Sequence, residues 1–292
     1  MSLFVIVLIL CSSFMHAGWN LLAHRERSEA VFFHRMLLLT VLIGFVPGVV
    51  SEALTHSLPL EAWICVAGSG LCSGAYFFWL SRSYESSDFT VVYPIARSLP
   101  VLMVGLGDVL RGRYVTSVGW MGMLLVVCGC ILVPLRSFGD FAQQRYFNRV
   151  NLWMFFTALG TVGYTMLDKI AAEVVHQGPA TAARYGYIFA LFTYGVYALL
   201  LRIFKRGGRS SNSVGWKAPF LAAWLHFAAY WLVLWAYQLC QHASYILAFR
   251  QISIVIGVIL AFVIYKEQGR AIRLAGTFVL ASGLVLISLW GG

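Results

Sequence analysis

The feature that most constrains this chain is a succession of ten apolar stretches, each long enough to cross a bilayer as a helix. A spanning helix needs about 20 mostly apolar residues. Only 11% of the 292 residues are charged, whereas a soluble domain carries roughly 25%. The connections are short, so the sequence predicts an all-α integral membrane protein with ten transmembrane helices and no sizeable soluble domain. The predicted spans are 3–22, 31–50, 60–81, 88–110, 115–134, 150–168, 184–203, 217–239, 244–264 and 271–290.

The 21 Lys and Arg residues are distributed unevenly between the connections. Fifteen follow odd-numbered stretches and four follow even-numbered ones, while Arg97 and Arg250 lie inside stretches. Cytoplasmic loops of membrane proteins carry such an excess of positive charge. We therefore expect the odd-numbered loops in the cytoplasm and both termini outside. The net charge of +10 is explained by this asymmetry, so no nucleic-acid partner is expected.

Several kinds of site are not expected from the sequence. The first stretch lacks a basic leader and a small-residue cleavage site, so we expect a retained helix rather than a signal peptide. The six cysteines form neither a metal-ligand spacing nor a disulfide framework. No phosphate-binding glycine loop and no nucleophile elbow occurs. The sequence therefore predicts no metal, no cofactor and no enzyme activity.

An internal repeat relates the two halves of the chain. Residues 77–97 align without gaps on 230–250, an offset of 153 that places Tyr84 on Tyr237 and Arg97 on Arg250. One residue further on, Gly122 falls on Gly276 and Gly129 on Gly283. The first helices correspond loosely, Gly18-Trp19-Asn20 with Gly163-Tyr164-Thr165. The matches predict two five-helix repeats, at 1–140 and 141–292.

Five is an odd number, so the second repeat must enter the membrane from the opposite side. Inverted repeats of this kind build transporters whose binding site lies near the midplane, between the halves. Two halves that exchange conformations would expose one site to either side in turn. The repeat therefore predicts alternating access.

Three segments resemble the drug/metabolite transporter superfamily, EamA type. They are His16-Ala17-Gly18-Trp19-Asn20, Tyr93-Pro94-Ile95-Ala96-Arg97, and Lys266-Glu267 followed by Gly276 and Gly283. The resemblance covers essentially the whole chain and implies ten helices as two inverted repeats in a bacterial inner membrane. The sequence departs from the family in one residue, since Arg113 stands where the family often has Glu. The family's usual orientation, with cytoplasmic termini, also conflicts with the charge count above.

Arg97 and Arg250 are the main candidates for a substrate site. An arginine inside the hydrocarbon region costs a few kcal/mol or more. Arg97 lies nine residues into its span, about 13 Å deep at about 1.5 Å per residue, between Pro94 and Pro100, whose missing hydrogen bonds free backbone carbonyls. Arg250 is about six residues into its span. The alternatives are structural: Arg97 bonding free carbonyls, and Arg250 reaching toward the membrane surface.

The resemblance adds an expectation about these two arginines. Related organophosphate translocators hold substrate phosphate with basic residues of the fourth and ninth helices, and Arg97 and Arg250 resemble those positions. The match is partial, because the ninth helix there often carries two adjacent basic residues and this chain has Phe249-Arg250.

Further polar and aromatic residues complete the predicted site. Ser12, His16 and Asn20 form one stripe on the first helix, and polar residues at four-residue spacing form another on the sixth. Such stripes either join helices or line a path. His16, Asn20 and Tyr93 are expected to bind substrate, with Trp79 and Tyr230 as aromatic walls. His16 and Asp168 are candidates for proton coupling, since an imidazole titrates near neutral pH. Asp108 and Arg111 are expected to form a local surface pair.

These features predict a secondary transporter for a small polar or anionic metabolite, bearing a carboxylate, phosphate or phosphonate. The small-molecule substrate moves either passively or coupled to an ion, for which a proton is a candidate. Two alternatives stay open. One is an exporter of neutral amino acids or drugs, with purely structural arginines. The other is a flippase for a lipid or lipid carrier. The sequence leaves the oligomeric state undetermined.

Overall fold

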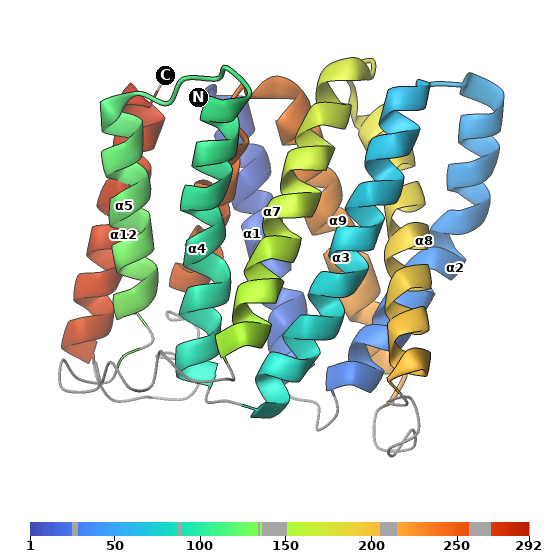
Figure 1. The fold of residues 1–292 in the computed structure, drawn as a ribbon, viewed down its shortest axis with the longest axis horizontal. Helices are drawn as coiled ribbons and strands as arrows, with labels where there is room; N and C mark the ends of the chain where they lie inside the picture. Colours follow the sequence, from blue (N-terminus) through green and yellow to red (C-terminus); the bar gives the residue numbers. More distant parts are fainter. Residues whose placement is uncertain are drawn as a thin grey trace.

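The computed structural model describes residues 1–24, 29–86, 89–133, 135, 151–204, 215–256 and 270–291. Every regular element in these ranges is a helix. The helices run side by side along one direction, and both chain ends lie at the same end of the bundle (Figure 1). They are α1 (Leu3–His24), α2 (Glu29–Thr55), α3 (Leu60–Ser86), α4 (Phe89–Leu110), α5 (Ser117–Leu132), α7 (Asn151–Val174), α8 (Pro179–Ile203), α9 (Lys217–Leu239), α10 (Ala243–Arg250) and α12 (Arg270–Trp290).

A helix is present at each of the ten predicted stretches, as far as the described residues extend. Within them, six helices are long and apolar enough to cross a membrane, and two shorter apolar helices cover Ser117–Leu132 and Ala243–Ile256. Of the two remaining helices, α4 has side chains that lie outside the described residues, and α7 does not qualify because its threonines, Asp168 and Lys169 lower its hydropathy. The all-helical fold is confirmed, and the crossing of the membrane by all ten helices stays a prediction.

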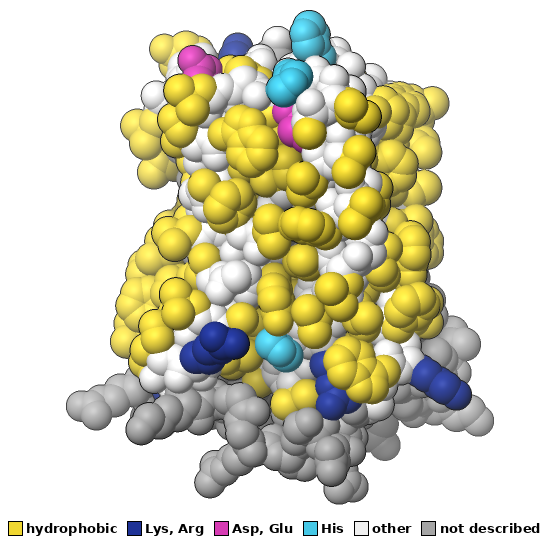
Figure 2. All heavy atoms as spheres, turned by 90° about the vertical axis from the view of Figure 1, so that its right-hand side faces the viewer, with side chains coloured by type: hydrophobic (Ala, Val, Ile, Leu, Met, Phe, Trp, Pro, Cys, Tyr) yellow, Lys and Arg dark blue, Asp and Glu magenta, His cyan; other side chains and the backbone are white. Residues whose placement is uncertain are grey.

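Large apolar side chains cover the outside of the bundle. On the face shown in Figure 2 they occupy the middle of the molecule, while Lys, Arg, Asp, Glu and His lie toward its two ends. A helix bundle in water buries its apolar stripe, so this belt indicates contact with lipid. Strongly exposed members of the belt include Leu42, Val46, Ile64, Leu106 and Phe278.

The helices pack in a pattern that is similar in the two halves. At one end of the row α5 packs on α12, and at the other α2 packs on α8 (Figure 1). Between them α3 packs on α7, and α9 packs on α1. Suppose that α1, α2, α3, α4 and α5 correspond in order to α7, α8, α9, α10 and α12. Then α3 corresponds to α9 and α7 to α1, so the contact between α3 and α7 is equivalent to the contact between α9 and α1. The packing is therefore what a twofold relation between the halves requires.

Glycines bring α5 and α12 into backbone contact. A Cβ atom on Gly122 would lie 2.8 Å from the carbonyl oxygen of Gly283, and one on Gly129 would lie 2.8 Å from that of Gly276. The predicted repeat equates Gly122 with Gly276 and Gly129 with Gly283, so the two contacts exchange when the halves are exchanged. Self-complementary contacts of this kind are the mark of a twofold interface.

A second pair of contacts follows the same rule. A Cβ atom on Gly18 of α1 would meet Leu225 of α9 at 3.3 Å, and one on Gly163 of α7 would meet Cys72 of α3 at 2.6 Å. Gly18 and Gly163 are predicted equivalents, and the offset of 153 pairs Cys72 with Leu225. The boundary between the predicted repeats, at residues 140 and 141, lies outside the described residues.

The close approach of α5 and α12 predicts that Gly129→Ala destabilises the protein. The new methyl group would meet backbone atoms that cannot move without separating the helices, and overpacking costs about 1–3 kcal/mol. Gly195→Ala on α8 is the matched control, since its Cβ would meet nothing within 4 Å. Thermal unfolding in detergent should show a lower Tm for Gly129→Ala alone; equal Tm values for the two variants would contradict the close contact.

Candidate functional site

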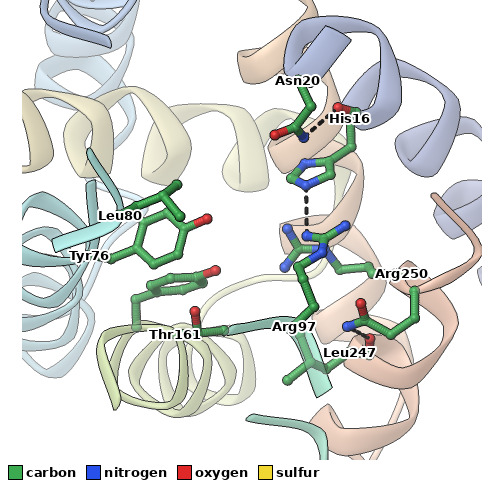
Figure 3. A pocket seen from close by; sticks show the side chains of 10 residues that line it. His16, Asn20, Tyr76, Leu80, Arg97, Thr161, Leu247 and Arg250 are labelled. Carbon is green, nitrogen blue, oxygen red and sulfur yellow. Dashed lines mark hydrogen bonds between the residues drawn. The ribbon is translucent and has the colours of Figure 1, made fainter. Parts of the chain in front are cut away.

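A cavity of about 30 Å³ lies halfway along the bundle. His16, Arg97 and Thr161 on its wall each lie within three residues of the midpoint of their own helix. A water molecule needs about 10–15 Å³ of such space, so this conformation has room for about two waters and none for a metabolite. The lining residues, most of them labelled in Figure 3, are His16, Asn20, Tyr76, Leu80, Arg97, Thr161, Tyr164, Leu247, Arg250 and Gln251.

Arg97 connects α1 with the segment that follows α10. Its Nη1 lies 2.8 Å from Nε2 of His16, and its Nη2 donates a hydrogen bond to Oγ of Ser253 at 2.5 Å. The Ser253 hydroxyl in turn donates to the backbone carbonyl of Arg250 at 2.8 Å. The two arginines predicted as equivalents are therefore brought to one site, joined through a single serine.

The regular α-helix breaks immediately after Arg250. α10 ends at this residue, Gln251 forms a single turn, and residues 252–256 are helical again. The amides of Gln251 and Ile254 bond three residues back, to the carbonyls of Ala248 and Gln251. By contrast, α4 continues through the region of Pro94 and Pro100, where we expected free carbonyls. Irregular backbone deep in a membrane bundle is tolerated where it lines a cavity. Interrupted helices at this depth are typical of transporter binding sites.

Arg250 is buried without a complete set of partners. It is only 7% exposed, and its Nη1 atom makes no hydrogen bond to the described residues. Its guanidinium carbon lies 5.7 Å from the centroid of the Tyr230 ring, a cation–π contact. Among the residues described, no carboxylate oxygen lies within 4.0 Å of it. Arg250 therefore points into the bundle rather than toward the membrane surface.

His16 faces a hydrogen-bond donor on each side of its ring. The indole N–H of Trp19 lies 3.1 Å from Nδ1, and the Arg97 guanidinium lies 2.8 Å from Nε2. Both neighbours can only donate, whereas a neutral imidazole has a single acceptor nitrogen. If Nδ1 accepts from Trp19, the proton on Nε2 points at Arg97. An acceptor placed between His16 and Arg97 would satisfy both groups.

A second cavity of about 30 Å³ adjoins the first. His16, Tyr76, Tyr164 and Arg250 line both. The remaining walls are largely aromatic and come from α1, α3, α8 and α9. The residues that line only this second cavity are Trp19, Ser73, Phe77, Phe189, His226 and Tyr230.

The positions of the predicted site residues are as follows. His16, Asn20, Arg97 and Arg250 line the first cavity, and Tyr230 lines the second. Trp79 lines neither, because its ring packs on Phe156 at 5.2 Å between centroids. The side chain of Tyr93 lies outside the described residues.

Among the polar residues of the site, the sequence reasoning missed two, Gln251 and Ser253. Both follow Arg250 closely. The spacing of three residues between Arg250 and Ser253 was the available signal, since residues three apart share a helix face.

The two predicted polar stripes have mixed roles. Ser12 joins α1 to α9 through a hydrogen bond to the carbonyl of Ala229 at 2.7 Å. Asn20 donates to the His16 carbonyl at 2.8 Å, beside the cavity. On α7, the hydroxyls of Thr157 and Thr161 bond their own helix. One stripe therefore both joins helices and lines the cavity.

Asp168 lies at the end of the α7 stripe and is fully buried. Its carboxylate accepts hydrogen bonds from the hydroxyls of Tyr185, at 2.7 Å, and of Tyr230. Tyr230 in turn offers its ring face to Arg250. Asp168 lines neither cavity, but one tyrosine separates it from the candidate site.

The expected surface pair of Asp108 and Arg111 is wrong. Asp108 is buried and accepts hydrogen bonds from the amide and hydroxyl of Ser244, at 2.9 and 2.7 Å, and from the amide of Ala243. It thus supplies the N-terminal cap of α10, whose free amides need acceptors. Arg111 pairs instead with Glu173 of α7 at 2.7 Å. Sequence spacing gave no sign that α10 begins beside the end of α4.

The apolar helices and their lipid-facing belt define a multi-pass membrane protein. Residues 3–135 match the model of the EamA-like transporter family, which is part of the drug/metabolite transporter superfamily. This match confirms the resemblance predicted from the sequence and indicates a membrane transporter of that type. Residues 136–292 lie outside the match.

The fold itself has counterparts among solved structures. One of 28 matching chains, described only as "Crystal structure of protein", superposes with a TM-score of 0.72. The similarity covers 98% of this chain and 97% of that chain at 13% sequence identity, so it concerns the fold alone. No curated protein matches this sequence.

Proposed function

We propose that this protein is a secondary transporter that moves a small anionic metabolite, bearing a carboxylate, phosphate or phosphonate, across a bacterial inner membrane. The observation that carries the proposal is the buried Arg250 guanidinium, with an unpartnered nitrogen at a cavity that Arg97 and His16 also line. A buried charge is strongly unfavourable unless it is paired. A substrate anion would supply the missing partner.

The hydrogen-bonding of His16 supports the same choice of ligand. If Nδ1 of His16 accepts from Trp19, its Nε2 proton and the Arg97 guanidinium point at each other. An oxyanion between them would accept from both, and from Nη1 of Arg250 as well. A neutral ligand that only donates would leave Nη1 of Arg250 without an acceptor. Asn20 extends the polar wall, and Tyr93, one helical turn before Arg97, is proposed to complete it.

Alternating access of an inverted repeat is proposed as the mechanism. The exchange of glycine contacts between α5 and α12, and between the α1–α9 and α7–α3 pairs, supports a twofold relation between the halves. The cavity is too small for a metabolite in this conformation. A change in the packing of the two halves would therefore have to open it to each side in turn.

The anion proposal predicts different losses for three variants. Arg97→Ala and Arg250→Ala should each weaken carboxylate, phosphate or phosphonate binding roughly tenfold to hundredfold, since a charged hydrogen bond is worth about 1.5–3 kcal/mol. Arg97→Lys should recover only part of the loss, because an ammonium lacks the planar fork of donors. Affinity and Tm are measured together on the purified protein.

Arg113→Ala is the control, since Arg113 lies at a helix end with its side chain 43% exposed. Unchanged anion affinity in Arg97→Ala, together with a lower Tm, would favour structural arginines and an exporter of neutral amino acids or drugs. Binding of lipids in place of small anions would favour the flippase.

Proton coupling is proposed to act through Asp168, with His16 as the other candidate carrier. Asp168 bonds to two tyrosine hydroxyls, and Tyr230 connects it to Arg250. Protonation of Asp168 would release Tyr230 and so alter the surroundings of Arg250. In proteoliposomes, Asp168→Asn should abolish uptake driven by a pH gradient while substrate exchange persists. Glu61→Gln, at the start of α3, is the control; gradient-driven uptake by Asp168→Asn at the wild-type rate would refute this role.

The charge distribution leads us to propose that both termini face the periplasm, against the family's usual orientation. Arginines and lysines near the ends of spans set orientation during insertion. A C-terminal alkaline phosphatase fusion, which is active only outside the cytoplasm, should therefore be active. A fusion to a cytoplasm-specific fluorescent protein should stay dark. The reverse pair of results would show cytoplasmic termini.

A further inference from the structure

The second cavity has no role in the proposed anion site. It adjoins that site, since Arg250, His16, Tyr76 and Tyr164 line both cavities. The centroids of the Tyr76 and Tyr164 rings lie 5.8 Å apart, edge to face. Because Arg250 and these two rings line both spaces, the second cavity lies directly against the arginine site.

Aromatic rings form most of the second cavity. Phe189 stacks on Tyr230 with centroids 4.9 Å apart, and Tyr164 meets Tyr230 edge to face at 5.9 Å. The His226 ring, one helical turn before Tyr230 on α9, contacts Trp19 and Phe77 edge to face, at 5.4 and 5.6 Å. Aromatic side chains attract a further ring in offset or edge-to-face geometry. The cavity is therefore suited to a flat unsaturated group.

Two polar atoms interrupt this aromatic wall. Nδ1 of His226 is buried and makes no hydrogen bond to the described residues. Ser73, which carries a hydroxyl group, is also buried and also lines the cavity. None of the lining residues is a carboxylate, so the wall offers no negatively charged partner for an ammonium group. A ligand with an uncharged ring and one hydrogen-bonding substituent fits this wall.

Building on the proposed function, we infer that the second cavity receives the body of the substrate, and that the transported metabolite is an aromatic acid. In the opened conformation that transport requires, its acid group would lie between Arg97, Arg250 and His16. Its ring lies among Phe189, Tyr164 and Phe77. A ring hydroxyl or ring N–H donates to Nδ1 of His226, which satisfies the buried nitrogen.

The inference is tested by calorimetric titration of the purified full-length protein with four acids of graded structure. They are 4-hydroxyphenylacetate, phenylacetate, cyclohexylacetate and propionate. We expect phenylacetate to bind about tenfold more tightly than cyclohexylacetate of similar size, because only the aromatic ring gains from the ring geometry. The ring hydroxyl should add a further several-fold gain. Propionate should bind most weakly.

Two variants connect the ring preference to the second cavity. Phe189→Leu should remove most of the advantage of phenylacetate over cyclohexylacetate while leaving propionate affinity unchanged. Phe192→Leu is the matched control, because this partly exposed residue lies three positions further along α8 and lines neither cavity. His226→Phe keeps a ring but removes Nδ1, so it should abolish only the gain from the ring hydroxyl.

The possible failures are distinguishable. Equal affinities for phenylacetate and cyclohexylacetate would overturn the aromatic subsite and leave the anion site standing. An equal loss for all four acids in Phe189→Leu would assign this residue a structural role and also overturn the subsite. Acid binding that does not depend on Arg97 would refute the proposed function itself.

Discussion

The structure depends on one unfavourable interaction, the placement of two guanidinium groups in the middle of a bundle that is surrounded by lipid. A charged group in such surroundings is tolerated only where protein dipoles, water or a counter-ion stabilise it. The bundle supplies part of this. Arg97 has His16 and Ser253, and Arg250 has the face of the Tyr230 ring. What the protein leaves unsatisfied, the proposed anionic substrate would satisfy.

The sequence predicted the helices because hydrocarbon leaves a spanning chain few alternatives to the α-helix. The offset of 153 residues also predicted that Arg97 and Arg250 are related, and the structure places both at one cavity. Hydropathy was less informative for α7, whose polar stripe reduces the signal that identifies a span. The residues that make α7 hard to recognise as a span, such as Thr161, are among those that line the cavity.

Other features depend on contacts between distant segments, which no local pattern encodes. Asp108 looked like a surface residue from its position near a helix end, yet it caps a helix 135 residues further on. Trp79 has the chemistry of a cavity wall, but its direction on α3 places it against Phe156. The interruption after Arg250 is confined to Gln251, with neither proline nor glycine to mark it.

The cap that Asp108 provides has a mechanical consequence. Its hydrogen bonds link the beginning of α10 to the C-terminal end of α4. The hydrogen bond from Arg97 to Ser253 links the middle of α4 to the segment beyond α10. Hydrogen bonds at two separate heights therefore link α4 to α10 and to the segment beyond it, and both arginines lie on this pair of helices. The proposed change in packing between the two halves would have to keep or replace both of these links.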